Sequence, residues 1–78
     1  MTLKIISAVE IVFEGEVRQV TLPGAMGSFT VLKNHASLVS TLTAGEIRFV
    51  DPDGNEETRK ITGGLADIDN NVVSVCLY

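Results

Sequence analysis

Turn-forming residues recur at short, regular intervals along this chain, and their spacing constrains the fold more than any other feature. Glycine, proline, asparagine and aspartate gather at intervals of roughly seven to eleven residues. The clusters occupy positions 14–16, 23–24, 33–34, 44–45, 51–54, 63–64 and 69–71. Because strands in small β-domains are about this long, the spacing predicts an all-β sandwich or barrel.

Short runs rich in β-branched and aromatic residues lie between these clusters, and such runs favour strands. They span residues 3–8, 11–13, 17–22, 28–32, 47–51, 56–62, 65–69 and 72–78. Segment 36–43 fits either one helical turn or a strand. No stretch of about twelve residues keeps a helical period, so we expect no long helix.

Three turns have a clear chemical signature. Residues 22–25 suit a type II turn, in which proline fixes φ and the following glycine supplies a positive φ. Residues 51–54 suit a type I turn, with proline second and glycine fourth. Asn70 and Asn71 tolerate the left-handed backbone of a tight hairpin.

A chain of 78 residues forms one domain, so residues 1–78 are expected to share a single core. A domain this small needs a dense core, a covalent or metal staple, or a partner. The hydrophobic fraction of 45% allows a dense core. One cysteine, Cys76, cannot form an internal disulfide, and with the single histidine, His35, it cannot build a structural zinc site.

The charge balance excludes some partners. Six lysines and arginines against ten acidic residues give a net charge of −4, which repels phosphate backbones and anionic lipids. We therefore expect no nucleic-acid partner, and membrane association only through other proteins. The first apolar run meets Glu10 too early for a signal peptide, and no apolar run is long enough to span a membrane. The lone cysteine indicates a reducing, cytoplasmic setting.

No group of residues indicates catalysis. His35 has conceivable companions in Ser28, Ser37 and Asp67, but one histidine with common residues carries little information. A loop histidine of this kind normally binds backbone carbonyls or contacts a partner. The paired carboxylates all lie at turns or strand ends, where solvated residues are expected.

Metal and phosphate sites are also poorly supported. Residues 51–55 begin like a calcium loop, but the glycine comes too early and the closing glutamate is absent. The acidic cluster at 67–70 offers too few ligands. The glycines at 24–27 and 63–64 lead into strands rather than helices, so they are expected to form tight turns or bulges. Cys76 is expected to be a small buried hydrophobe or a strand-face residue. We expect no cofactor.

One connection carries apolar side chains with little charge around them. Met26 and Phe29 stand among glycines between residues 22 and 35. Large apolar side chains on a loop often mark an interaction patch. Phe29 could instead turn inward and join the core, which would leave Met26 alone on the surface.

Several blocks of the sequence resemble the epsilon subunit of the bacterial F-type ATP synthase. They follow the family's order and spacing over nearly the whole chain. The blocks are EIVFEGEV at 10–17, LPGAMGSFTVLKNHASL at 22–38, LTAGEIRF at 42–49, ITGGLADI at 61–68 and NVVSVCL at 71–77. The resemblance implies a two-sheet β-sandwich of about ten short, mostly antiparallel strands.

The resemblance also implies a function. Members of this family are non-catalytic rotor subunits of the central stalk, which bind the gamma subunit and rest on the polar loops of the membrane c-ring. They help to couple proton translocation to ATP synthesis at the cytoplasmic face of the bacterial plasma membrane. The family's ring-facing loop corresponds here to Ala25, Met26, Gly27 and Ser28, and its gamma-side histidine corresponds to His35.

The sequence departs from the family at three points. Ser28 stands where many members have an acidic residue, and Lys33 and Asn34 stand where many have Pro-Gly. The helical hairpin that follows the sandwich in typical members has no counterpart in residues 1–78, so its inhibitory and nucleotide-sensing roles are not expected here. The alternative function is that of a free-standing β-sandwich that binds a small ligand in an apolar pocket.

Overall fold

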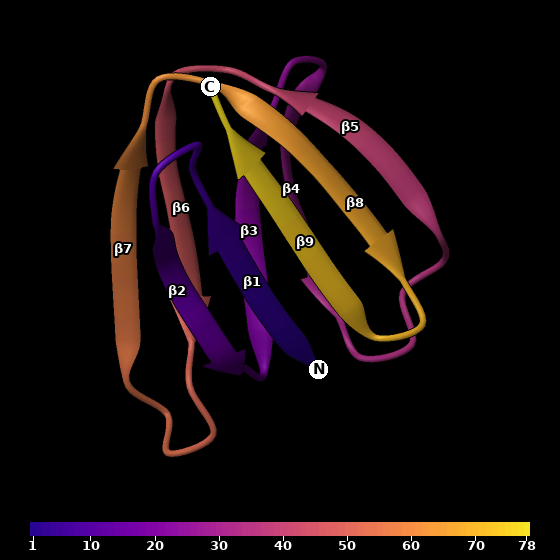
Figure 1. Cartoon of the computed structure of the whole chain (residues 1–78). Helices are drawn as coiled ribbons and strands as arrows, with labels where there is room; N and C mark the ends of the chain where they lie inside the picture. The colour runs from indigo at the N-terminus through magenta and orange to yellow at the C-terminus, as the bar shows by residue number, and fades with distance from the viewer.

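The computed structural model describes residues 1–78 and contains nine strands and no helix (Figure 1). The all-β prediction is confirmed, with nine strands where about ten were expected. No segment forms a helix that could span a membrane. The strands are β1 Thr2–Ile6, β2 Ile11–Glu16, β3 Gln19–Gly24, β4 Gly27–Leu32, β5 Leu38–Leu42, β6 Gly45–Val50, β7 Glu56–Ile61, β8 Gly64–Asp69 and β9 Val72–Leu77.

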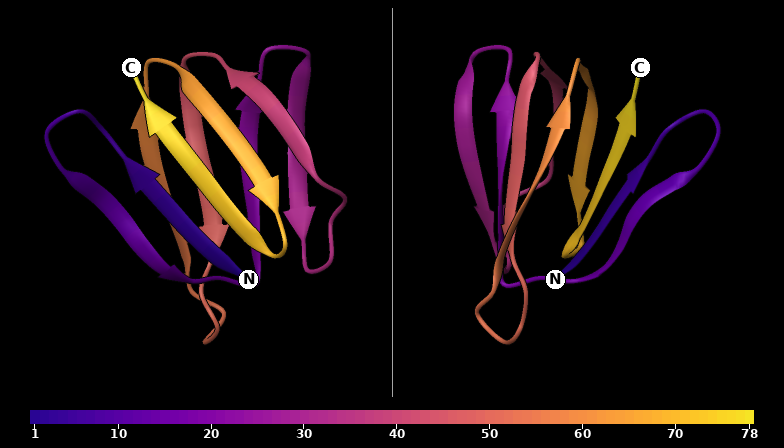
Figure 2. Two further views of the ribbon diagram at one scale, coloured as in Figure 1. Left: turned by 45° about the vertical axis from the view of Figure 1, so that its right-hand side comes forward. Right: turned by 90° about the vertical axis from the view of Figure 1, so that its left-hand side faces the viewer.

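Strand pairing follows one continuous path, β2-β1-β9-β8-β5-β3-β6-β7, with β4 on the other side of β3. All pairs are antiparallel except β1 with β9, which run in parallel. Only one residue pair, Gly24 with Leu42, joins β3 to β5. The sheet curls at this join, so two halves face each other (Figure 2). The expected division into two separate sheets is not confirmed, because the pairing is continuous.

Alternation along the strands builds the core between these halves. In β3 and β8 every second residue is buried, which is the period expected when one face of a strand packs inward. Both halves contribute, and the largest buried side chain is Phe49. The core consists of Leu3, Ile5, Val17, Val20, Leu22, Val31, Leu42, Ile47, Phe49, Ile61, Ala66, Ile68, Val73 and Val75.

Arg59 covers an aromatic pair formed by Phe13 on β2 and Phe49 on β6. The rings of Phe13 and Phe49 lie 4.4 Å apart between centroids. The guanidinium carbon of Arg59 lies 5.6 Å from the Phe49 centroid and 6.0 Å from that of Phe13. Glu57 accepts a hydrogen bond of 3.2 Å from the same guanidinium. A flat cation over the rings shields this side of the core from water without an unpaired charge.

Two of the predicted turns are confirmed. The Gly54 N–H donates a hydrogen bond of 3.0 Å to the Asp51 carbonyl, which closes the turn at 51–54. Asn70 and Asn71 have φ values of 48° and 61°, as the hairpin between β8 and β9 requires.

The prediction for residues 22–25 is wrong. Pro23 and Gly24 belong to β3, and the turn lies two residues later, at Ala25 and Met26. Gly24 is required for close packing instead of a positive φ, since a Cβ there would lie 2.7 Å from the Gly27 carbonyl oxygen. The positive φ of this turn, 128°, falls on Gly27.

Two other sequence expectations change. Segment 36–43, which fitted a helical turn or a strand, contains strand β5. Residues 14–16, which looked like a turn cluster, complete β2, and the chain turns after them. Gly15 lies beneath the Phe13 ring, where a Cβ would be 3.2 Å from the ring. Gly15 therefore makes room for the Phe13 ring within the strand and does not mark a turn.

Candidate partner-binding surfaces

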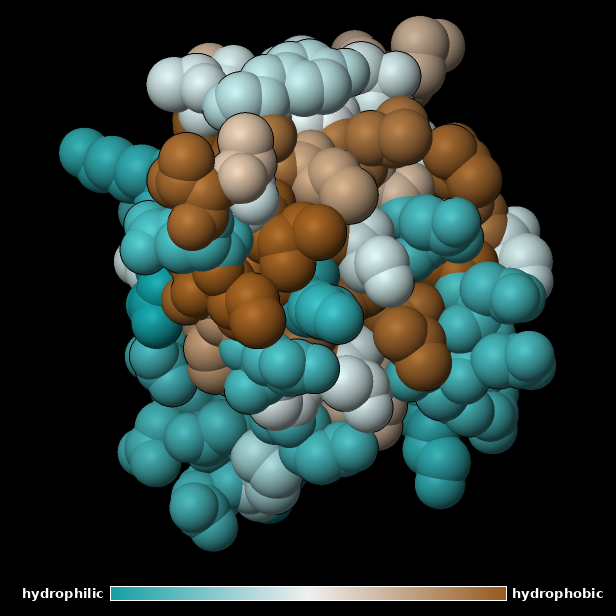
Figure 3. All heavy atoms as spheres, in the orientation of Figure 1, coloured by the Kyte–Doolittle hydropathy of each residue, from teal (hydrophilic) through white to brown (hydrophobic).

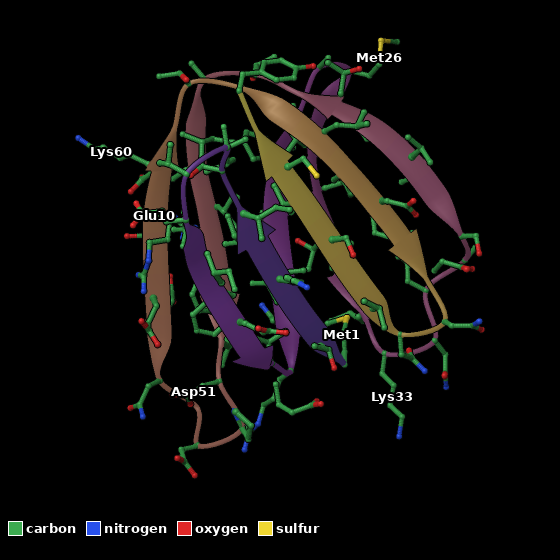
Figure 4. The ribbon with its side chains drawn as sticks, viewed as in Figure 1. Met1, Glu10, Met26, Lys33, Asp51 and Lys60 are labelled. Atoms are coloured by element: carbon green, nitrogen blue, oxygen red, sulfur yellow. The ribbon has the colours of Figure 1, made fainter.

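The turn between β3 and β4 projects Met26 into solvent at one end of the molecule (Figure 4). Met26 is fully exposed, so it contributes nothing to the core. Gly27, at a φ of 128°, makes the two-residue turn possible. Ala25 and Ser28 are exposed beside it. The four residues expected to contact the c-ring thus lie together on one hairpin tip.

A shallow hollow of about 670 Å³ opens beside this tip. It lies between the β3–β4 hairpin and β5. Its lining consists of Ala25, Met26, Gly27, Ser28, Phe29, Leu38, Val39, Ser40 and Thr41. Phe29 is half-buried and packs against the core, which settles the open question about its direction. Met26 remains on the surface, as both alternatives for Phe29 required.

His35 lies in the loop after β4 and is half-buried. Its N–H donates to the Leu32 carbonyl at 3.1 Å, and its Nδ1 lies 2.7 Å from the Ala36 carbonyl oxygen. Because a carbonyl oxygen only accepts, Nδ1 carries the proton. Nε2 is the ring nitrogen left for a partner. This matches the expectation that the histidine satisfies backbone carbonyls.

The His35 loop is tied to the turn between β8 and β9. The Asn34 N–H donates to Oδ1 of Asn71 at 2.6 Å, and Nδ2 of Asn71 donates to Oδ1 of Asn34 at 3.1 Å. The Ser37 hydroxyl donates to Asp69 at 2.6 Å. Asn34 has a φ of 66°, which asparagine adopts more readily than most residues. The loop therefore has a fixed shape.

Strand β4 separates the two candidate surfaces. The Met26 tip precedes β4 and the His35 loop follows it, and Figure 4 shows Met26 and Lys33 at opposite ends. A strand of six residues spans about 20 Å. The sites expected for the c-ring and the gamma subunit are therefore far enough apart to contact two partners at once.

An apolar row crosses the outer face of β2, β1, β9 and β8, and the sequence analysis did not identify it. Ile6 lies opposite Ile11 on β2 and Cys76 on β9, and Cys76 lies opposite Leu65 on β8. Figure 3 shows brown side chains gathered on the upper part of this face, with teal below. Cys76 is exposed, so it is a strand-face residue. The sequence did carry one sign of this row. Leu65 and Cys76 stand at alternate positions to the buried residues of β8 and β9, so they face outward although they are apolar.

Acidic residues border the apolar row. In the next row Glu14 lies opposite Lys4, and Asp67 follows on β8. Beyond it Glu16 accepts hydrogen bonds from the Met1 ammonium at 3.1 Å and from the Thr2 hydroxyl at 3.0 Å. These donors, the ammonium first, lower the pKa of Glu16. The face is thus apolar toward the Met26 end and acidic toward the other.

The possible catalytic companions of His35 are not brought together with it. Ser28 lies at the opposite end of β4 from His35, and Ser37 donates to Asp69 instead of the imidazole. No three histidine, cysteine or acidic side chains are grouped so that they could hold a metal. Asp51 accepts from the N–H groups of Asp53 and Asn55, both at 2.9 Å, so its carboxylate stabilises its own turn.

The chain matches the family model of the ATP synthase delta/epsilon chain β-sandwich domain over residues 1–77. It is 40% identical to the ATP synthase epsilon chain of Campylobacter jejuni, covering 96% of this chain and 58% of that one. It is 39% identical to the epsilon chain of Chlorobaculum tepidum, covering 90% of this chain and 80% of that one. The chain thus spans little more than half the length of the Campylobacter relative.

Two solved structures are similar to the fold. One is a chain of the Euglena gracilis mitochondrial ATP synthase, from a structure of its OSCP, F1 and c-ring. It has a TM-score of 0.89 and 25% identity, and the match covers 96% of this chain and 48% of that one. The other comes from the central stalk and c-ring of the Tetrahymena thermophila enzyme. It has a TM-score of 0.78 and 12% identity, and covers 97% and 61% of the two chains. The second likeness concerns the fold alone.

Proposed function

The chain belongs to the ATP synthase delta/epsilon family as its β-sandwich domain, and from this premise we propose that it is a non-catalytic part of the central stalk. In this role it binds the gamma subunit and rests on the polar loops of the c-ring. It helps to couple proton translocation to ATP synthesis. It reaches the cytoplasmic face of the bacterial plasma membrane only through these protein partners.

The observation that carries the proposal is the position of two candidate surfaces at opposite ends of one strand, the exposed Met26 tip and the loop that holds the half-buried His35. The Met26 tip, with Ala25, Gly27 and Ser28, is the proposed c-ring contact, and His35 is the proposed gamma contact. A part that transmits torque must hold its partners at a fixed geometry. Ladder hydrogen bonds along β4 and the ties of the His35 loop to Asn71 provide that rigidity.

Charge also supports this proposal. The net charge of −4 opposes adsorption to anionic lipid headgroups. The Met26 tip itself is uncharged, and Ser28 supplies no carboxylate to the ring. Contact with the c-ring therefore depends on apolar packing of Met26 and on main-chain groups of the turn.

Binding to gamma provides the test. The purified chain and the gamma subunit of the same organism are mixed and separated by size exclusion at low and at physiological salt. Co-elution in a defined stoichiometry is expected. Separate elution under both conditions would reject the proposal.

The hollow of about 670 Å³ favours one alternative, a β-sandwich that binds a small apolar ligand. A thermal-shift screen with lipids, nucleotides and sugars separates the two functions. A ligand that raises Tm at micromolar concentration, in a chain that does not bind gamma, would favour the alternative. The hollow is shallow and open to solvent beside the exposed Met26, which suits a protein surface better than an enclosed ligand.

A further inference from the structure

Strand β7 has one free edge, and its unpaired main-chain groups belong to every second residue. The strand pairs only with β6 and ends the pairing path of the sheet. In the loop between the two strands the Asp51 N–H donates to the Asn55 carbonyl at 2.9 Å, and hydrogen-bonded pairs recur at every second residue from there. Glu57 and Arg59 therefore bond to β6. The main-chain groups that point toward solvent belong to Glu56, Thr58 and Lys60.

The charges on β7 reverse in sign about Thr58. Glu56 and Glu57 precede it, and Arg59 and Lys60 follow it. Lys60 forms no ion pair, and its side chain extends away from the sheet at the edge of the molecule (Figure 4). The strand is thus negative at one end and positive at the other, which makes it complementary to an antiparallel copy of itself.

Among the antiparallel registers that bring the outward main-chain groups of two copies together, one alone matches the charges. Two copies centred on Thr58 place each Glu56 opposite a Lys60 of the other copy. They also place each Glu57 opposite an Arg59. A shift of two residues instead places Glu57 opposite Glu57, or Arg59 opposite Arg59, and such like-charge pairs are destabilising. Charges on an edge strand usually prevent pairing with another chain, whereas the charges on β7 select one register.

The other two free edges of the sheet lack this property. Strand β2 carries two glutamates and no basic residue, so it repels a copy of itself. Strand β4 carries no charge, so nothing on it selects a register. Only β7 matches a second copy both in hydrogen bonding and in the sign of its charges.

We infer that two copies of the free chain pair through β7 and form a twofold-symmetric dimer. Each facing pair of outward residues exchanges two main-chain hydrogen bonds, as in any antiparallel ladder. Lys60 gains Glu56 of the second copy as its partner. One strand edge makes a small, transient interface, so we expect a Kd of about 0.1–1 mM. The inference is independent of the proposed function, because β7 belongs to neither candidate partner surface.

Exchanged charges test the register. Lys60→Glu and Glu56→Lys each place like charges opposite one another at both ends of the paired strands, so each variant alone should dimerise at least about tenfold more weakly. An equal mixture of the two variants should dimerise like the parent, because every facing pair is again opposite in sign. Lys33→Glu is the matched control, since it makes the same change of charge on an exposed residue in the loop after β4. It should alter Kd less than about twofold.

Sedimentation equilibrium at low salt, from about 0.02 to 2 mM chain, measures these dissociation constants. A parent chain that stays monomeric over this range would overturn the inference. Single variants that dimerise like the parent, or a mixture that does not recover, would overturn it as well.

Hydrogen exchange on the unaltered chain locates the interface without any substitution. We expect the outward amides of β7 to exchange at least about twofold more slowly at the highest concentration than at the lowest. The amides of β4 should exchange at the same rate at both concentrations, because that edge stays free. A dimer that leaves the β7 amides at the monomer rate would place the interface elsewhere and reject the inference.

Discussion

Gly24 and Phe29 lie in direct contact across the β3–β4 hairpin. A Cβ atom on Gly24 would lie 2.9 Å from two carbon atoms of the Phe29 ring, and 2.7 Å from the Gly27 carbonyl oxygen. The glycine lets the ring pack against the core beside the hollow.

Gly24→Ala is therefore expected to lower the free energy of unfolding by about 1–3 kcal/mol, as overpacking of a tight site does. Urea unfolding monitored by circular dichroism measures the change. The double variant Gly24→Ala, Phe29→Leu should remain destabilised, because the clash with the Gly27 carbonyl is with backbone. Full recovery in the double variant would mean that only the ring opposes the added methyl group.

Met26→Asp is expected to leave Tm unchanged, because the side chain is fully exposed and substitutions of this kind stay within about 0.5 kcal/mol. Binding of the chain to the c-ring should fall, since a carboxylate would replace the apolar contact. Val9→Asp is the matched control, because Val9 is 90% exposed on the β1–β2 loop. Equal losses of binding in both variants would show that added charge alone, and not Met26, is responsible.

Arg59→Ala should reduce stability by about 1 kcal/mol, since it removes the cation over the Phe49 ring and the stem that covers it. Lys60→Ala provides the control on the same strand, because Lys60 is exposed on the opposite face. Thermal unfolding of both variants makes the comparison. A loss for Lys60→Ala as large as that for Arg59→Ala would contradict a covering role for Arg59.

The stability of the protein at acid pH should depend on the hydrogen bonds that the Asp51 carboxylate accepts within its own turn. The hydrogen bond from the Asn55 N–H is the largest cause that lowers the pKa of Asp51 below its ordinary 3.8. Because the folded-state pKa is the lower one, this stabilisation is present above about pH 4 and is lost as the pH falls through the folded value. Asp51→Asn should therefore be less stable than the parent at pH 7, and the difference should shrink as the pH falls below about 4. A stability difference that stays constant over this range would reject the assignment.

Strand alternation and turn chemistry made most of the fold predictable from the sequence. The turn at residues 51–54 and the Asn70–Asn71 hairpin followed from φ preferences that act locally. The Pro-Gly sequence at 23–24 led to a wrong turn prediction. Glycine is needed at position 24 for close packing against Phe29, and a turn with a positive φ would have required glycine there too. Segment 36–43 was ambiguous because β5 passes between the two halves and is buried only at Leu42.

The candidate site was predictable only in part. The exposure of Met26 followed from its place in a glycine-rich turn. The row of Ile6, Ile11, Leu65 and Cys76 did not, because outward apolar residues on a strand look like ordinary strand residues until register places them side by side. The hollow depends on how β4 and β5 diverge, which no local pattern in the sequence specifies.

The parallel pairing of β1 with β9 sets an order of events during synthesis. Thr2 pairs with Val72, so β1, the first strand of this sheet to be synthesised, waits for β9, the last strand of the sheet, before that side of its ladder can form. Contacts so distant along a chain close slowly, because the entropy of a long loop must be overcome first. The hairpins β3–β4 and β6–β7 have no such delay. The nascent chain therefore completes its sheet at β1 and β9, after translation has passed every other strand.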